Sequence, residues 1–307
     1  MRRRSFLAGL AATAVPSRPA AAADDAASGR APFAVCDYTQ GRVFLIGADG
    51  APVWSHDAPD TNDLWALPDG NLLFTTGHGV VEVTRAKEVV FRYDSPEEIY
   101  ACQRLPNGNT FVGECTSGRL LEVDRSGRVV KETRLLPAGR GGGHAFMRNA
   151  RALPGGRFLV AHYESETVRE YDAAGRVVWE AKAPGGAHSV ARLPSGRTLV
   201  ATADRDRGEP RFLEIERDGR VSWQLTNDDL PGRPLRFLGG FHRLANGHTV
   251  LTNWLGHGHV GDAPLLLEVT PDKKVVWTYE RHDVLRTASS VVVLDPSGRA
   301  PAGPIVH

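Results

Sequence analysis

The sequence predicts an all-β fold, a six-bladed β-propeller with four antiparallel strands in each blade. Three observations predict it: a ladder of Leu-Pro-x-Gly turns, a second ladder of polar turns that lead into apolar strands, and two chain ends that complement each other. Successive turns of one ladder lie about 40 to 50 residues apart, and repeats of that length with four short strands are typical of propeller blades.

The first ladder consists of tight turns between two apolar runs. Proline presets φ at the second turn position, and glycine adopts the positive φ that closes the turn. Each motif therefore predicts a hairpin between the first and second strands of a blade. The five motifs, of which the last has alanine in place of proline, are Leu67–Gly70, Leu105–Gly108, Leu153–Gly156, Leu193–Gly196 and Leu244–Gly247.

The second ladder predicts the hairpin between the third and fourth strands of each blade. Its six copies cover residues 48–54, 87–91, 126–130, 174–179, 218–223 and 272–277. Most fourth strands carry a large aromatic residue late in the strand, which we expect to pack between neighbouring sheets. These residues are Trp54, Phe91, Trp179, Trp223 and Trp277, and the third copy has Lys131 near this place.

The two ends of the chain predict how the ring closes. Residues 289–298 resemble a sixth first strand with its turn, whereas residues 32–37 resemble a second strand that lacks its first. We therefore expect the C-terminal strand to pair beside the N-terminal strands, because this completes the sixth blade. The predicted propeller covers residues 32–298, and residues 299–307 form a C-terminal tail.

The N-terminus predicts export. Residues 2–7 contain a twin-arginine pattern, a mild apolar stretch follows to Val15, and residues 20–23 offer alanine-type cleavage sites. We assign residues 1–23 to a twin-arginine-type signal peptide and residues 24–31 to a linker. The expected location is the periplasm or the outside of the cell.

Composition excludes several partners. The chain has 37 basic and 36 acidic residues and no basic block, so we expect no nucleic acid partner. The mature part has no apolar run of the ~18 residues that a membrane-spanning helix needs, so we expect no membrane span. We also expect the protein to be a monomer. Three cysteines, Cys36, Cys102 and Cys115, do not make a disulfide framework, and buried free thiols are the favoured interpretation.

Histidines gather on one predicted face of the propeller. Loops from a fourth strand to the next blade, and from a second strand to a third, open on this face. Nine of the eleven histidines lie on or beside such loops, whereas His248 and His307 do not. The nine are His56, His78, His144, His162, His188, His242, His257, His259 and His282.

Three of these histidines are expected to converge at the mouth of the central channel. His144, His188 and His242 each follow a glycine-rich approach and lie just before or at the start of an innermost strand. A single histidine at a strand end can instead satisfy backbone groups, but a group of imidazoles at a cleft favours a functional pocket. The wider set of candidate ligand-binding residues is His144, Arg148, His162, Asp204, Asn253 and Trp254.

Metal and anion binding are further hypotheses for this face. His257 and His259 form an H-x-H pair that could hold a divalent metal, although no cysteine ligand accompanies them. Arg148, close to His144, could clamp an anionic group through its guanidinium. The neighbouring arginines on this face, Arg205, Arg207, Arg233 and Arg236, are interspersed with acidic residues, which favours a solvated network of ion pairs.

The alternating LPxG turns and xDxxGxVxW strands resemble secreted bacterial propellers of the pyrroloquinoline-quinone-like superfamily, including arylsulfotransferase-type proteins, over residues 32 to 298. The quinone dehydrogenases of that superfamily have eight blades and commonly a vicinal cysteine pair, whereas this chain has room for six blades and has no adjacent cysteines, so we expect no bound quinone. The resemblance to arylsulfotransferases implies six blades and a channel histidine that accepts a sulfuryl group, but we expect this protein to differ from them in having no additional N-terminal domain.

The leading hypothesis is an exported propeller that binds a small molecule or glycan in a histidine-rich pocket, with a divalent metal as a candidate cofactor. The alternative is a periplasmic enzyme, either a sulfuryl transferase or a glycan hydrolase or lyase, with His188 or His242 as nucleophile or base. A third hypothesis, a protein-interaction scaffold, predicts an exposed apolar patch, for which the sequence gives little support.

Overall fold

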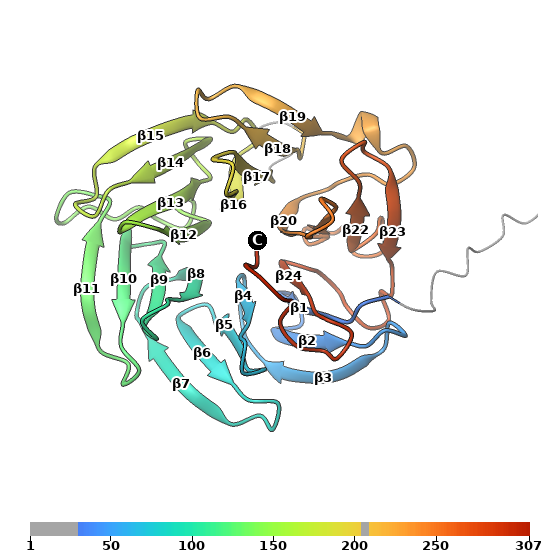
Figure 1. Ribbon diagram of the computed structural model, residues 1–307, viewed down its shortest axis with the longest axis horizontal. Helices are drawn as coiled ribbons and strands as arrows, with labels where there is room; N and C mark the ends of the chain where they lie inside the picture. Colours follow the sequence, from blue (N-terminus) through green and yellow to red (C-terminus); the bar gives the residue numbers. More distant parts are fainter. Residues whose placement is uncertain (1–29, 204–208) are drawn as a thin grey trace, which may run out of the picture.

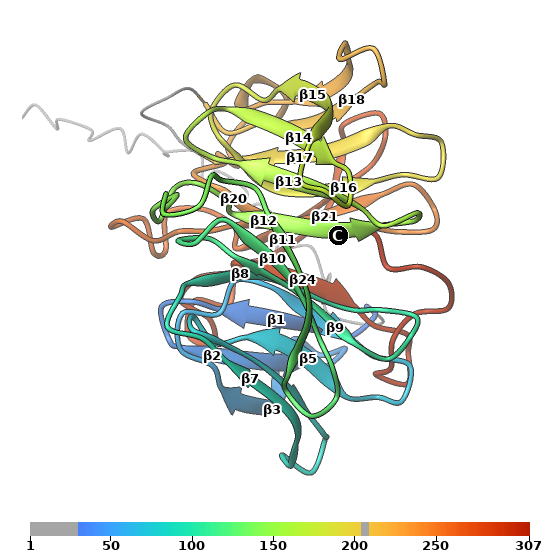
Figure 2. The same cartoon turned by 90° about the vertical axis from the view of Figure 1, so that its left-hand side faces the viewer.

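The computed structural model describes residues 30–203 and 209–307 and confirms the six-bladed propeller (Figure 1). Each blade is a four-stranded antiparallel sheet within these residues, and the innermost strands surround a central channel. Figure 2 shows the blades from the side, with the strands of each blade running between the two faces of the disc. The predicted signal peptide lies outside the described residues.

The strands are given from the innermost to the outermost in each blade. Blade 1 has β24 (Ser290–Val293), β1 (Phe33–Asp37), β2 (Arg42–Ile46) and β3 (Pro52–Asp57). Blade 2 has β4 (Leu64–Ala66), β5 (Leu72–Thr75), β6 (Gly79–Val83) and β7 (Val89–Asp94). Blade 3 has β8 (Ile99–Arg104), β9 (Thr110–Glu114), β10 (Arg119–Val123) and β11 (Val129–Arg134).

The remaining blades follow the same order. Blade 4 has β12 (Asn149–Leu153), β13 (Arg157–His162), β14 (Thr167–Tyr171) and β15 (Val177–Lys182). Blade 5 has β16 (Ala187–Arg192), β17 (Thr198–Thr202), β18 (Phe212–Ile215) and β19 (Val221–Leu225). Blade 6 has β20 (Leu238–Arg243), β21 (Thr249–Asn253), β22 (Leu266–Val269) and β23 (Val275–Tyr279). A short 3-10 helix, η1 (Asn227–Asp229), precedes blade 6.

The turn ladders lie where the sequence predicts them. Each LPxG motif joins the first and second strands of a blade, and the Gly70 amide donates to the Leu67 carbonyl at 2.9 Å. Gly70 has φ +91°, a conformation that costs a residue with a Cβ atom. This explains why the fourth turn position is glycine in all five copies.

Ring closure takes the predicted form. Strand β24 pairs antiparallel with β1, with Phe33 opposite Val293 and Cys36 opposite Ser290. The C-terminal strand thus supplies the innermost strand of a blade whose other strands come from the N-terminus. The tail then turns back to the channel, where Arg243 and Val306 form an isolated bridge and the C-terminus lies at the centre of the ring (Figure 1).

The fourth-strand aromatic residues pack between blades, as expected. Their polar or cationic neighbours come from the next blade around the ring: the Trp179 indole donates to the Arg217 carbonyl at 2.8 Å, and the Trp223 indole donates to the Pro271 carbonyl at 2.9 Å. The Arg192 guanidinium lies 4.6 Å from the ring centre of Trp179. Each aromatic residue therefore joins two sheets rather than filling the core of one.

A buried glutamate, which the sequence analysis did not identify, accompanies the aromatic residue in four blades. It lies on the third strand directly opposite the aromatic residue of the fourth, as Glu170 lies opposite Trp179. An arginine from the chain that begins or precedes the next blade reaches it; the Arg192 guanidinium lies 2.9 Å from the Glu170 carboxylate. The four pairs are Glu82 with Arg104, Glu170 with Arg192, Glu214 with Arg243, and Glu268 with Arg30.

The described part of the chain has no helix long and apolar enough to cross a membrane. All three cysteines are buried free thiols, as predicted. Exposed valines occur on the outermost strand of every blade, for example Val53, Val130 and Val178. Because they are spread around the rim, they do not gather in one blade as a single docking patch would.

Removing the charge of Glu170 should destabilise the propeller. The Glu170 side chain is 1% exposed and faces the guanidinium groups of Arg157, Arg192 and Arg217. Glu170→Gln leaves these cations without their counter-charge, and breaking such a buried pair costs about 3 to 5 kcal/mol. We expect a loss of about 3 kcal/mol or more in the free energy of unfolding, measured by urea denaturation.

Glu122→Gln is the matched control. Glu122 occupies the same repeat position in blade 3, opposite Lys131, but its hydrogen bonds come from the side-chain amides of Asn107 and Asn109. We expect a change within about 1 kcal/mol. Equal losses in the two variants would contradict the role of the arginine–glutamate pairs.

Candidate functional site

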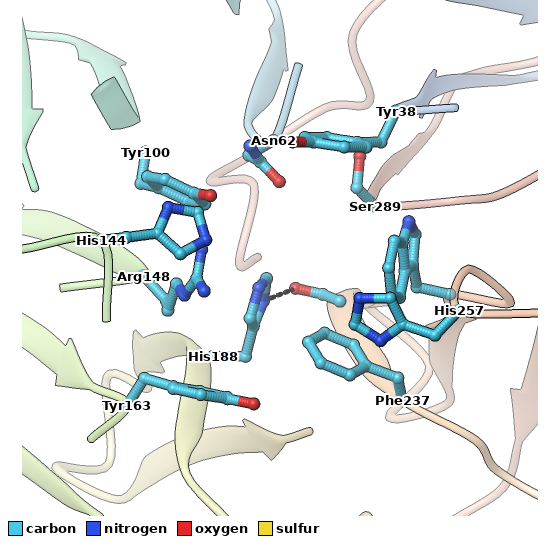
Figure 3. A pocket seen from close by; sticks show the side chains of 12 residues that line it. Tyr38, Asn62, Tyr100, His144, Arg148, Tyr163, His188, Phe237, His257 and Ser289 are labelled. Atoms are coloured by element: carbon cyan, nitrogen blue, oxygen red, sulfur yellow. Dashed lines mark hydrogen bonds between the residues drawn. The ribbon is translucent and has the colours of Figure 1, made fainter. Parts of the chain in front are cut away.

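A pocket opens at one mouth of the central channel and encloses about 160 Å³ (Figure 3). Twelve residues line it, and all of them lie on the predicted functional face, in the loops or at the strand ends identified above. Every blade contributes at least one. The twelve are Tyr38 and Ser289 from blade 1, Asn62 from blade 2, Tyr100 from blade 3, His144, Arg148 and Tyr163 from blade 4, His188 from blade 5, and Phe237, Gly239, Trp254 and His257 from blade 6.

Arg148 is the one permanent charge among the described residues that line the pocket. Its guanidinium carbon lies 4.7 Å from the ring centre of Tyr100 and 5.1 Å from that of Tyr163, and Figure 3 shows Arg148 between the two rings. Its Nε atom is buried without a hydrogen-bond partner in the described chain. Two aromatic faces thus hold a cation for which the described residues supply no ion-pair partner.

His188 presents an imidazole in a fixed orientation. It is the second residue of β16, and its Nδ1 lies 2.7 Å from the carbonyl oxygen of Gly239 in the next blade. A carbonyl only accepts, so Nδ1 carries the proton and Nε2 keeps its lone pair. Burial, with the nearby charge of Arg148, lowers the pKa of His188 to about 3, which keeps the ring neutral.

Gly239 has to be glycine for this arrangement. A Cβ atom at this position would lie 2.8 Å from the backbone oxygen of Ser289. The absence of a side chain therefore lets the first strand of blade 6 pass close to blade 1. In this position the Gly239 carbonyl accepts the hydrogen bond from the Nδ1 of His188. The sequence predicted this glycine in an approach before the strand, whereas it lies within β20, and its role is close backbone packing.

His144 lies at the more open side of the pocket. Its side chain is 56% exposed, and its Nδ1 is 2.9 Å from both carboxylate oxygens of Glu98. The ring also meets the edge of Tyr100, with ring centres 5.7 Å apart. A carboxylate that orients an imidazole in this way is a common support for proton transfer.

Aromatic rings form the opposite wall. The ring centres of Phe237 and Trp254 lie 5.0 Å apart, and Phe237 also contacts His188 at 5.0 Å. His257 stands edge-on to Trp254 at 4.8 Å. The pocket therefore has a cationic side, made by blades 3 and 4, and an apolar side, made by blade 6 (Figure 3).

The structure brings five of the predicted candidates to this pocket and leaves the others elsewhere. His144, Arg148, His188, Trp254 and His257 line it. His162 is buried within blade 4, where its Nδ1 donates to the Phe146 carbonyl and its Nε2 accepts from the Tyr171 hydroxyl, at 2.8 Å each. Asp204 lies outside the described residues, as do Arg205 and Arg207.

The sequence predicted His242 at the start of its strand, and this is wrong, because His242 is the fifth residue of β20. The sequence placed Gly239 and Gly240 before the strand, whereas the strand begins at Leu238 and contains both. His242 consequently lies deeper in the channel, where its Nδ1 accepts from the Val293 amide at 2.9 Å and its ring lies 6.5 Å from His307. The expected convergence of three histidines is therefore wrong, because His144 and His188 line the pocket and His242 does not.

Asn253 supports the site from behind. It is fully buried; its Oδ1 accepts from the Arg236 amide, and its Nδ2 donates to the carbonyl oxygens of Pro234 and Pro264. These bonds fix the loops that carry Phe237 and Trp254. Asn253 thus holds two loops in place and is not among the residues that line the pocket.

The structure separates the proposed metal pair. His257 faces the pocket, whereas the Nδ1 of His259 lies 3.0 Å from Asp262. Among residues 30–203 and 209–307, no group of three or more His, Cys, Asp or Glu side chains could hold a metal ion. The described residues therefore give the metal hypothesis no support.

Several lining residues were missed by the sequence analysis, namely Tyr38, Asn62, Tyr100, Tyr163, Phe237 and Ser289. Each lies on the predicted face, and this is the signal that could have selected them. Their depth toward the channel axis, however, depends on strand register and loop path.

Comparisons with known proteins identify the fold. Residues 117–254, less than half of the chain, match the family model described as outer membrane protein assembly factor BamB, a pyrroloquinoline-quinone-like repeat family. None of the curated proteins matches the chain. The likeness to arylsulfotransferases stays a prediction.

Solved structures share the architecture. A protein of unknown function from Bacteroides caccae is 25% identical, with a TM-score of 0.76 over 86% of this chain and 98% of that one. A streptogramin B lyase is 12% identical, with a TM-score of 0.57 over 81% and 79%. A virginiamycin B lyase from Staphylococcus aureus is 14% identical, with a TM-score of 0.56 over 81% and 84%. The two lyases show a common fold alone.

Acid should destabilise the protein through its buried neutral histidines. Burial lowers the pKa of His162 and of His242 to about 4, and that of His188 to about 3. The unfolded chain binds these protons near pH 6.5, so the unfolded state binds more protons and stability falls as the pH drops below 6.5. Each histidine contributes about 1.5 kcal/mol of this loss between pH 6.5 and 5.

His162→Gln tests this dependence away from the pocket. Removing one titrating group should make the decline in unfolding free energy smaller by about 1.5 kcal/mol over that interval, measured by urea denaturation at each pH. Thr110→Val, which replaces a buried hydroxyl that has no partner in the described chain and removes no titrating group, is the control and should leave the slope unchanged. An unchanged slope in the His162 variant would show that this residue does not remain neutral when buried.

Proposed function

We propose that the protein is an exported propeller that binds a small organic ligand in the channel-mouth pocket. The observation that carries the proposal is the convergence of lining residues from all six blades on one cavity. The fold by itself brings strand ends from every blade to the channel mouth, but the grouping of an arginine, three imidazoles and five other aromatic rings around one cavity exceeds what the capping of strand ends requires. The N-terminal twin-arginine pattern supports the export part of the proposal.

Unused bonding capacity supports the proposal. The Nε2 of His188 makes no hydrogen bond to the described residues, and Arg148 makes no ion pair with them, although both side chains reach the cavity. Of these atoms, the Arg148 Nε is buried without a partner in the described chain, and such a group costs free energy. A ligand in the cavity can bond to the Nε2 of His188 and to the guanidinium of Arg148, and a site with few polar groups among aromatic walls is typical of small-molecule binding.

A variant with a filled pocket should lose ligand binding without losing its fold. The side chain of Asn62 projects into the cavity (Figure 3), so Asn62→Trp should occupy the space that a ligand needs. We expect compounds from a fragment library that raise the Tm of the wild-type protein to have no effect on this variant.

Ser195→Trp is the matched control, because it adds the same ring to an exposed turn between β16 and β17 on the opposite face. It should respond like the wild type. If the same compounds stabilise all three proteins, they bind elsewhere and the pocket proposal is wrong.

Catalysis is the second candidate function, and the fixed tautomer of His188 favours it. A neutral imidazole whose Nδ1 proton is held by a carbonyl presents Nε2 as a nucleophile or base. In sulfuryl transfer, Nε2 would form a bond to sulfur while the bond from sulfur to the aryl oxygen breaks and a phenolate leaves beside Arg148. An acceptor hydroxyl would then form a bond to sulfur while the bond from sulfur to Nε2 breaks, and the proton of the hydroxyl would pass to the released phenolate.

An activity assay tests this candidate with aryl sulfates and a phenolic acceptor, and in parallel with a panel of glycans for hydrolysis or elimination. Turnover should fall at least a hundredfold, on the order of what a general base or nucleophile contributes, in His188→Ala. His242→Ala, deeper in the channel, should retain turnover if the pocket is the active site. No turnover of any substrate would contradict an enzymatic function of these classes.

A further inference from the structure

We infer that the ligand of the channel-mouth pocket is a single-ring aromatic acid, a planar monocarboxylate whose ring carries a hydroxyl or amino hydrogen-bond donor. The inference rests on the proposed function and specifies its ligand. Three features of the cavity carry it: the unpaired cation, the flat aromatic wall, and an imidazole that can only accept.

The sign and size of the ligand charge follow from the lining residues. Arg148 is the one permanent charge among them, and none of the described lining residues is acidic. The nearest carboxylate named above, Glu98, is engaged with His144. A single unpaired guanidinium favours a ligand with one negative charge, because a cation with no partner in a shielded site gains most from one charge-assisted pair.

The tyrosine rings on either side of Arg148 favour a flat anionic group. Tyr100 and Tyr163 lie 4.7 Å and 5.1 Å from the guanidinium carbon and occupy its two sides (Figure 3). The edge of the guanidinium is then the part that faces the cavity. A carboxylate can place both oxygens in the plane of that edge and accept two parallel hydrogen bonds.

Tyr100 adds a donor at the same place. Burial raises the pKa of its hydroxyl, although Arg148 opposes this, so the group stays protonated. No hydrogen bond engages this hydroxyl within the described residues. It is therefore available to a carboxylate oxygen that Arg148 binds.

The body of the ligand is limited by the opposite wall and by the volume. Phe237 and Trp254 offer aromatic surface at 5.0 Å from each other, which suits an offset or edge-to-face contact with a further ring. The cavity encloses about 160 Å³, and a cavity of about 150 Å³ holds one benzene molecule. One ring therefore fills the enclosed space.

His188 determines the remaining polar group. Its Nδ1–H donates a hydrogen bond to the Gly239 carbonyl, so its Nε2 can only accept. A ring without a donor would leave Nε2 desolvated and unpaired, and sites built around such a group discriminate strongly against ligands that lack the partner. A phenolic hydroxyl or an aromatic amine supplies it.

Calorimetric titration of the full mature protein with matched compounds tests the inference. The acids are the three hydroxybenzoate isomers, and the best of them is compared with its carboxamide, with benzoate and with the corresponding hydroxybenzenesulfonate. We expect the acid to bind at least about tenfold more tightly than the neutral amide, because charge-assisted hydrogen bonds are the stronger ones. It should also exceed benzoate, which lacks the donor, and the sulfonate, which is tetrahedral.

Two arginine variants locate the effect. Arg148→Met keeps an unbranched chain between the tyrosine rings but removes the charge, and should abolish the preference for acid over amide. Arg233→Met, at an exposed arginine before β20, is the control and should keep it. Thermal unfolding of both variants checks that they fold. Arg148→Lys is an additional variant, which keeps the positive charge but not the planar edge. It should bind the acid more weakly than the wild type.

The outcomes separate the ligand class from the pocket itself. If the amide or an uncharged ring binds as tightly as the acid, and Asn62→Trp abolishes that binding, the inferred acid is wrong and the pocket proposal stands. Tighter binding of the sulfonate would overturn the carboxylate in the same way. If neither these compounds nor a fragment library binds to the pocket, the proposed function fails together with the inference.

Discussion

The contact between consecutive blades is the constraint on which the rest of the structure depends. In four interfaces a buried glutamate of one blade forms an ion pair with an arginine from the chain that begins or precedes the next blade. An aromatic residue opposite the glutamate packs over the pair. A carboxylate as buried as Glu170 is tolerable only with such a partner. The repeat recurs in the sequence partly because four of the six blades present the same carboxylate and aromatic residue to an arginine of the next blade.

This arrangement leaves one face free to vary. The turns that close the hairpins are short and constrained, as the φ of +91° at Gly70 shows. The connections at the other face carry none of the glutamate–aromatic–arginine contacts, so their residues can differ from blade to blade. Tyr100, Arg148 and Phe237 lie there and have no equivalents that recur around the ring. The architecture and the candidate site are therefore built from different parts of the same repeat.

The same division explains what the sequence could predict. Turn motifs and aromatic positions recur six or nearly six times, so their period reveals blade number, strand order and ring closure. The pocket has no period, and its composition depends on single registers: β20 begins at Leu238 and contains an irregularity between Leu238 and Phe241, which carries His242 past the mouth of the channel. His188 stays at the mouth of the channel because it is the second residue of its strand. A repeat pattern in the sequence does not resolve such a difference of a few residues.

The chemistry of the pocket depends in turn on the angular position of the blades. The tautomer of His188 in blade 5 is set by a carbonyl of blade 6, and Arg148 in blade 4 is held partly by Tyr100 of blade 3. Neither arrangement is a property of one sheet, because each bond or ring contact crosses a blade boundary. A ring that loosened at one interface would lose the orientation of these groups before any strand separated. The pair of Glu214 with Arg243 lies at the same interface of blades 5 and 6 as the bond from His188 to Gly239, so this ion pair also helps to maintain the orientation of His188. The interface of blades 3 and 4, which Arg148 and Tyr100 share, has none of the four ion pairs, and its geometry depends on the packing of the two sheets.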